Sequence, residues 1–98
     1  MFVWPPPPTK VVNLKDDAYD VRIDRKTKWG NPYIIGKDGT REEVIRKFAD
    51  WILTQPHLMN ALHELKGKRL GCWCKPGACH GDVLARLADT VKSDSDVF

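Results

Sequence analysis

The chain lacks the features by which membrane and secreted proteins are usually recognised. Its 98 residues contain no apolar run near the ~20 residues that a membrane-spanning helix needs. The start, MFVWPPPP, has neither the basic region nor the apolar core of a secretory signal. The net charge of +3 is small, so it is compatible with an anionic ligand without requiring nucleic acid as a partner. We therefore expect a cytoplasmic protein with no membrane partner.

Cysteine is also scarce, and the three cysteines all lie in one segment, residues 69–84, RLGCWCKPGACHGDVL. An odd number at such close spacing does not build the disulfide framework of a small secreted domain. A composition of 42% hydrophobic and 30% charged residues argues against a disordered or fibrous chain and suits one small core. We predict a single domain over residues 10–92, between a proline-rich arm (1–9) and a frayed tail (93–98).

Hydrophobic periodicity and helix-start signals predict the order of strands and helices. In a strand over residues 19–25, Tyr19, Val21 and Ile23 share one face, and the charged residues between them face solvent. The sequence TREE at 40–43 is typical of a capping box that opens a helix. The predicted order is strand 10–14, strand 19–25, a long loop, a helix after Thr40, a helix from Pro56 to Gly67, strand 69–74 and a last helix from Cys79 or His80.

Two helices separate the second and third strands, which permits the right-handed crossover that joins parallel strands. We therefore predict an α/β fold: a small single-domain sandwich with a short, mixed or partly parallel sheet of about three to four strands and three helices. Ligands of α/β proteins usually bind where such strands end. The end of the third strand, within the cysteine segment, is thus the first place to expect a site.

The cysteine segment has two interpretations. Along a strand Cys72 and Cys74 should project together, with Trp73 on the opposite face. The following Pro-Gly turn then returns Cys79 or His80 toward them, and three thiolates with one imidazole form a known zinc ligand set. The spacing is not that of a familiar zinc motif, however, and adjacent Cys79 and His80 do not easily bind one ion. The alternative is that Cys72 and Cys74 are small buried residues of the core.

His80 is the leading candidate for a catalytic residue. It falls in the first turn of the predicted last helix, where free backbone amides bind anions, and Gly81 beside it lets a ligand approach closely. Asp82 could orient the imidazole or act as a base. Cys79 at the helix start should have a lowered thiol pKa and could act as a nucleophile, or it could simply use its sulfur as a weak cap of the helix. The alternative is that Asp82 only interacts with the helix dipole and His80 is exposed.

The loop WGNPY, residues 29–33, is the second candidate site. Gly30 can adopt positive φ, and Pro32 keeps Asn31 out of helical geometry. The Asn31 amide could then read a base edge or a sugar hydroxyl, while Trp29 or Tyr33 stacks on a base. The alternative is a structural turn whose tryptophan fills the core. Basic residues surround the loop and could face a phosphate: Arg22, Arg25, Lys28, Lys37 and Arg41.

The pairing of WGNPY with CWCKPGACHGD resembles the domain-of-unknown-function family numbered 4326, which consists of small phage and bacterial proteins. The resemblance covers about residues 10–89 and implies a phage or bacterial source, without assigning an activity. It also implies a shared site at the positions that match the motifs: Arg25, Gly30, Asn31, Pro32, Arg41, Cys72, Cys74, Pro76, Cys79 and His80.

These patterns predict a pocket for a nucleotide-like, phosphate-bearing small molecule. They leave open whether the ligand is hydrolysed, transferred through a glycosyl bond or only sequestered. The alternative is a zinc-stabilised module that binds a host protein or nucleic acid, and zinc is the one cofactor that the residues indicate. Because so small a domain forms only a shallow cleft, a site shared within a homodimer also stays open.

Overall fold

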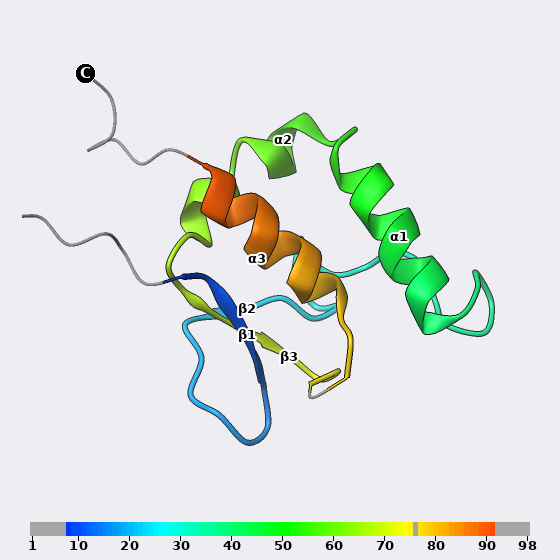
Figure 1. Ribbon diagram of the computed structural model, residues 1–98, viewed down its shortest axis with the longest axis horizontal. Coiled ribbons are helices and arrows are strands. Elements are labelled where there is room, and N and C mark those ends of the chain that lie inside the picture. The colour runs from blue at the N-terminus through cyan, green and yellow to red at the C-terminus, as the bar shows by residue number, and fades with distance from the viewer. Residues whose placement is uncertain (1–7, 76, 92–98) are drawn as a thin grey trace, which may run out of the picture.

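The computed structural model describes residues 8–75 and 77–91, which contain both helices and a sheet (Figure 1). Most of the predicted arm 1–9 and all of the predicted tail 93–98 lie outside the described residues. The elements follow in the order β1 (Lys10–Asn13), β2 (Val21–Arg22), α1 (Arg41–Ile52), α2 (Pro56–Met59), the 3-10 helix η1 (Leu62–Glu64), β3 (Arg69–Cys72) and α3 (His80–Thr90). The predicted α/β class is confirmed.

β3 is the central strand of a three-stranded sheet, with β1 on one side and β2 on the other. Both pairings are parallel, which confirms the predicted crossover. Asn13 at the end of β1 pairs with Cys72, and Arg22 at the end of β2 pairs with Gly71. The carboxyl ends of all three strands therefore meet at one edge of the sheet, and β3 delivers the cysteine segment to the middle of that edge.

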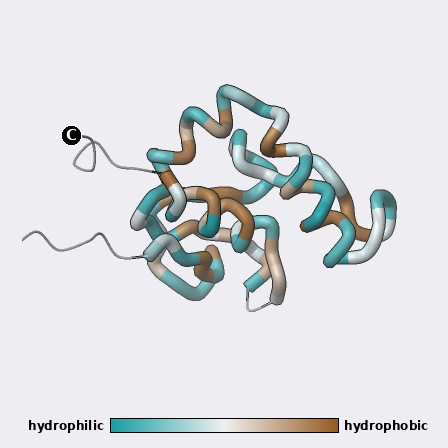
Figure 2. The backbone as a smooth tube through the Cα atoms, turned by 45° about the horizontal axis from the view of Figure 1, so that its top comes forward, coloured by the Kyte–Doolittle hydropathy of each residue, from teal (hydrophilic) through white to brown (hydrophobic). Residues whose placement is uncertain are grey.

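α3 lies between the sheet and the helices α1 and α2 (Figure 1). It contacts β1, β3 and α1, and its own buried side chains include Leu84 and Ala88. Hydrophobic residues recur at intervals along the helices, as expected for helices with one buried face (Figure 2). None of the helices among the described residues combines the length and the apolar character needed to cross a bilayer.

Gly81 seats the start of α3 directly against the sheet. A Cβ atom at this position would lie 2.6 Å from Cδ1 of Ile23 and 3.0 Å from Cγ2 of Val11, both distances too short for carbon atoms. The absence of a side chain therefore lets the helix begin where the strands end. The close approach that the sequence suggested for Gly81 is made by the protein's own strands, and it fixes Cys79 and His80 beside Cys72.

The helix-start signals are confirmed. The Thr40 hydroxyl accepts a hydrogen bond from the backbone N–H of Glu43, and the Glu43 carboxylate accepts one from the N–H of Thr40. Pro56 is the first residue of α2, and Gly67 ends the helical region with a φ of 75°.

Four predicted elements are shorter or divided in the structure, and β1 differs only by ending one residue early, at Asn13. β2 covers only Val21–Arg22, although the Ile23 N–H continues the ladder by donating to the Gly71 carbonyl. The predicted second helix is divided into α2 and η1, because Ala61, with φ −96° and ψ −1°, tightens the chain into a 3-10 turn. β3 ends at Cys72 instead of residue 74, since the Cys74 carbonyl accepts from the Gly77 N–H in a turn.

Candidate functional site: a pocket over a cysteine–histidine cluster

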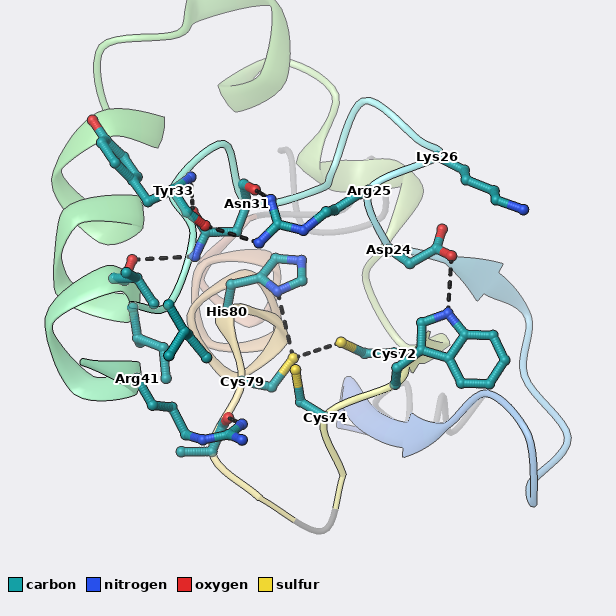
Figure 3. A pocket seen from close by; sticks show the side chains of 15 residues that line it. Asp24, Arg25, Lys26, Asn31, Tyr33, Arg41, Cys72, Cys74, Cys79 and His80 are labelled. Atoms are coloured by element: carbon teal, nitrogen blue, oxygen red, sulfur yellow. Dashed lines mark hydrogen bonds between the residues drawn. The ribbon is translucent and has the colours of Figure 1, made fainter. Parts of the chain in front are cut away.

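A pocket of about 350 Å³ opens at the carboxyl end of β3 (Figure 3). The loop between β2 and α1, the first turns of α1 and the segment before α3 form its walls. Its place agrees with the usual binding edge of parallel sheets. Two separate sequence motifs meet here, and the predicted site residues that line the pocket are Arg25, Asn31, Tyr33, Arg41, Cys72, Cys74, Cys79 and His80.

Three buried side chains form what we call the cysteine–histidine cluster: Cys72, Cys79 and His80. The two Sγ atoms are 2.8 Å apart, and Cys79 Sγ is 3.5 Å from His80 Nδ1. Both cysteines are free thiols, and all three donor atoms lie within 4.8 Å of one another, so the cluster could hold a metal ion. The adjacent residues Cys79 and His80 converge because Cys79 is extended, with φ −147°, while His80 is already helical.

His80 is held in one orientation by its surroundings. Its Nε2 atom lies 2.8 Å from the carbonyl oxygen of Ile23, and its ring packs edge-on against Phe48 with centroids 5.1 Å apart. A carbonyl oxygen can only accept, so Nε2 carries the hydrogen. The side chain is buried, which excludes the alternative that His80 is an exposed first-turn residue.

The thiols differ in how readily they lose a proton. The hydrogen bond with Cys79, helped by His80, lowers the pKa of Cys72 to about 4 against the effect of burial. The same bond and burial raise the pKa of Cys79, and they outweigh the Gly81 N–H that donates to its sulfur. The helix start therefore does not lower the pKa of Cys79 as expected. Burial, followed by the charge of Cys72, raises the pKa of Cys74.

Asp82 lies outside the pocket lining and completes a second capping box. Its Oδ2 accepts from the N–H of Cys79, and Oδ1 accepts from the Lys75 ammonium at 2.8 Å. The N–H of Gly81 donates to the Cys79 sulfur in return. Both carboxylate oxygens of Asp82 thus stabilise the turn that presents the cluster, in keeping with its alternative role at the helix start.

Hydrogen bonds made by its own polar groups hold the WGNPY loop in place. The Asn31 side chain is buried, and its Nδ2 donates to the Val44 carbonyl while its Oδ1 accepts from the Tyr33 N–H. The Arg25 guanidinium donates to the carbonyls of Asn31 and Tyr33. Arg41 reaches across the pocket to the Ala78 carbonyl at 2.9 Å. These bonds hold the loop against α1 and α3, so the amide of Asn31 is committed to the backbone.

Trp29 and Gly30 stand behind the pocket and do not line it. Trp29 is 3% exposed and belongs to the core, as in the structural alternative for this loop. Gly30 does not adopt positive φ; among the described glycines only Gly36, Gly39 and Gly67 do. What requires a glycine at position 30 is the close approach of the Arg25 backbone, whose Cα would lie 2.6 Å from an added Cβ.

The part of the pocket wall that Asp24 and Trp73 form was not predicted from the sequence. Oδ2 of Asp24 accepts from Arg22 at 2.8 Å and from the Trp73 indole N–H at 3.2 Å. The Oδ1 of Asp24 and the Nε of Arg22 are buried without a hydrogen-bond partner among residues 8–75 and 77–91. Asp24 was expected on a solvent-facing side of the strand, yet it is only 7% exposed, whereas the Trp73 side chain is 54% exposed. The remaining lining residues that sequence reasoning missed are Lys26, Ile35, Val44, Ile45 and Ala78.

The pKa of Asp24 lies below its usual 3.8, mainly because Arg22 donates to it and then because of Trp73, while burial opposes the shift. A carboxyl whose pKa is lower in the folded state stabilises the protein above the unfolded value and loses that effect as pH falls through the folded pKa. We therefore predict that Asp24→Asn loses less unfolding free energy than the wild type as the pH falls below about 4, measured by urea denaturation.

The control for this prediction is Asp20→Asn, which removes an exposed pair. The Arg69 guanidinium lowers the pKa of Asp20 to about 2, so this carboxyl titrates in the same acidic range. Each substitution on its own should reduce the dependence of the unfolding free energy on pH. Identical pH dependence in the wild type and in Asp24→Asn would contradict the assignment of the buried pair.

Comparison with known proteins places these features in a family. The model of the family described as "Domain of unknown function (DUF4326)" matches residues 9–90, a range that includes the whole pocket. The resemblance predicted from the two motifs is thereby confirmed.

Two viral proteins are similar to the chain in sequence. The chain is 42% identical over 94 residues to the "Uncharacterized 12.4 kDa protein in nrdA-td intergenic region" of Enterobacteria phage T4, covering 87% of this chain and 82% of that protein. It is 36% identical over 69 residues to "Uncharacterized protein R718" of Acanthamoeba polyphaga mimivirus, covering 62% of this chain and 52% of that protein. No solved structure matches the chain.

Proposed function

The chain belongs to the family of the domain of unknown function DUF4326, and we propose that its pocket binds a nucleotide-like ligand with a phosphate group. The observation that carries the proposal is the lining of one pocket by the cationic side chains of Arg25 and Arg41 together with the half-exposed Trp73 indole. A nucleotide combines a phosphate, which guanidinium groups bind, with a base, which stacks on an aromatic ring.

Cationic side chains in the pocket lining support a phosphate on the ligand. Arg25, Lys26 and Arg41 all line the pocket. The two guanidiniums use some of their N–H groups to hold backbone carbonyls, which fixes their orientation and leaves further donors free. An oriented guanidinium binds phosphate oxygens through paired, charge-assisted hydrogen bonds. The lining thus offers hydrogen-bond donors for an anion.

The pocket also offers an aromatic surface. The Trp73 indole lines it, is half exposed, and is held through its N–H by Asp24. A base that stacks on such a ring gains about 1–3 kcal/mol. The volume of about 350 Å³ is near the lower end of the ~300–1,000 Å³ usual for ligand pockets. The enclosed part of the site therefore has room for a single nucleotide but not for a longer nucleic acid.

The side chains support binding more than turnover. Asp82 is occupied by Cys79 and Lys75, and the Nε2 of His80 is bonded to Ile23. The remaining nitrogen of His80, Nδ1, faces the sulfur of Cys79 at 3.5 Å, so neither group is directed at a ligand in the pocket. We accordingly propose sequestration of the nucleotide-like ligand as the function, with His80 and Cys79 acting as part of the pocket floor.

The test is calorimetric titration of the purified chain with phosphate, adenosine, and adenosine mono- and triphosphate, repeated with the other bases. We expect a nucleotide to bind at least tenfold more tightly than phosphate or nucleoside alone, because the cations and the indole ring both contribute. Trp73→Ala should weaken that binding at least tenfold, since a stacking loss above ~1.4 kcal/mol corresponds to this factor.

Leu53→Ala is the matched control, since Leu53 is exposed and lies at the end of α1, outside the pocket lining. It should leave both stability and affinity unchanged. If no nucleotide binds at millimolar concentration, the proposed function is refuted.

A further inference from the structure

We propose that Cys72, Cys79 and His80 bind one zinc ion and that the fourth coordination position of the ion opens on the pocket. This site is separate from the groups that recognise the nucleotide-like ligand, and the proposal stands whether or not a nucleotide binds. It rests on the spacing of the three donor atoms, on the hydrogen-bonded state of the imidazole and on the place of Cys74.

The spacing of the donor atoms suits a tetrahedral ion. Zinc lies about 2.3 Å from sulfur and about 2.0 Å from nitrogen, so neighbouring ligands of a tetrahedral site are roughly 3.5–3.8 Å apart. Cys79 Sγ and His80 Nδ1 are 3.5 Å apart, and the whole set lies within 4.8 Å. The two sulfurs, at 2.8 Å, would separate by about 1 Å around an ion. Cys72 and Cys79 stand at the ends of their elements, where a side-chain rotation suffices.

The imidazole of His80 is prepared as a ligand. Since its Nε2–H donates to the Ile23 carbonyl, the neutral ring has its lone pair on Nδ1, the nitrogen that faces the Cys79 sulfur. Metal-binding histidines commonly donate their second ring nitrogen to a backbone carbonyl in this way, which fixes the ring and strengthens it as a ligand. The Gly81 N–H that donates to the Cys79 sulfur at 3.3 Å is a comparable outer contact.

Charge and burial favour a borderline-soft dication over magnesium or calcium. In the bound state both cysteines are thiolates, any remaining thiol proton having passed to solvent, and two thiolates with a neutral imidazole cancel the charge of a divalent ion. All three side chains are buried, and a neutral complex is the state that a buried site tolerates. Sulfur and nitrogen ligands select zinc, whereas magnesium and calcium require oxygen ligands.

Cys74 decides whether the site is open or closed. Its side chain is only half-buried and lines the pocket (Figure 3). Its sulfur lies beside those of Cys72 and Cys79, but Cys74 is not one of the three residues whose donor atoms all lie within 4.8 Å of one another. Four protein ligands are typical of structural zinc, and three ligands with one exchangeable position are typical of sites that bind water or a substrate atom. We assign Cys74 to the pocket wall, so that the fourth position faces the pocket.

The experiment is zinc titration against a chromophoric chelator, with the thiols kept reduced and no nucleotide present. The wild type should bind one zinc per chain, and Cys72→Ser and Cys79→Ser should each weaken binding at least ~100-fold. Cys74→Ser is the matched control, because it removes a neighbouring thiol of the same pocket. It should retain the stoichiometry and change the affinity less than about threefold.

X-ray absorption at the zinc edge of the wild-type chain keeps the test independent of how the variants fold. We expect two sulfur neighbours with nitrogen or oxygen completing the shell. Three sulfur neighbours, or loss of zinc in Cys74→Ser, would show a closed Cys3His site and overturn the open position. A wild-type chain that binds no zinc at micromolar concentration would overturn the metal site, while the nucleotide titration would be judged separately.

Discussion

Gly30→Ala is expected to destabilise the protein by about 3 kcal/mol and to abolish nucleotide binding by the pocket. The new Cβ would lie 2.6 Å from the Cα of Arg25 and 2.9 Å from the carbonyl oxygen of Asp24. These are backbone atoms, which cannot rotate away as a side chain can, so the cost belongs at the upper end of the usual range for overpacking. Asp24 and Arg25 line the pocket, and their displacement would move the carboxylate that holds Trp73 and one of the pocket's cations. Urea denaturation and nucleotide titration measure the two effects.

The matched control is Gly36→Ala, because it adds the same methyl group in the same loop. Gly36 has a φ of 91°, and nothing lies within 4 Å of its added Cβ. This change costs only the strain of a left-handed residue, about 1–2 kcal/mol, and should spare the pocket. Equal losses in the two variants would mean that backbone strain, rather than the contact with residues 24 and 25, determines the need for glycine at position 30.

The sequence predicted correctly those helix ends that depend only on a few neighbouring residues. The capping box at Thr40, the first-turn proline at 56 and the positive φ of Gly67 each depend on a few neighbouring residues, and all three are present. The parallel sheet followed from the two helices that separate the second and third strands. The lengths of β2 and β3 did not follow, because the ends of strands depend on which backbone groups find partners across the sheet.

The candidate site, too, was predicted only where the cause lies in the local sequence. The two motifs suggested which residues meet, and Arg25, Asn31, Arg41 and the cysteines do meet in one pocket. Asp24 escaped notice because alternation along a strand indicates a solvent-facing side only where nothing covers it. β3 ends at Cys72, the turn that follows is free of strand geometry, and the Trp73 N–H reaches the Asp24 carboxylate. No periodic pattern in the sequence reports such a contact between residues 49 positions apart.

The roles of residues within each motif also depend on tertiary contacts. Gly81 faces Val11 and Ile23 from two different strands, and Asp82 binds Lys75 across the turn. A histidine beside a glycine and an aspartate is equally compatible with a catalytic group and with a positioned metal ligand. The distinguishing fact is the bond from His80 Nε2 to the Ile23 carbonyl, since it determines which nitrogen is available. That partner is 57 residues away in the chain.

Asn31→Ala should cost about 3 kcal/mol, the second of the two largest effects expected here. It leaves the Tyr33 N–H without its acceptor and removes the second hydrogen bond to the Val44 carbonyl, which keeps its bond within α1, and an unpaired buried polar group costs about 1–3 kcal/mol. If Asn31 instead served to read a base, the substitution would weaken nucleotide binding and leave the free energy of unfolding unchanged. Urea denaturation of the ligand-free chain separates these two roles.

Asn31→Asp sharpens the same test, because it keeps the shape of the side chain and changes one atom. The carboxylate can still accept from the Tyr33 N–H, but its second oxygen would face the Val44 carbonyl, 3.1 Å from the atom that now donates. The carboxyl is then favoured in its protonated form, so its pKa should rise in the folded state, and the stability of the variant should fall as pH increases through that value. We expect the deficit relative to the wild type to be smaller at pH 4 than at pH 7. A deficit independent of pH would mean that the bond to Val44 contributes nothing, and Asn31 would then be available to the ligand after all.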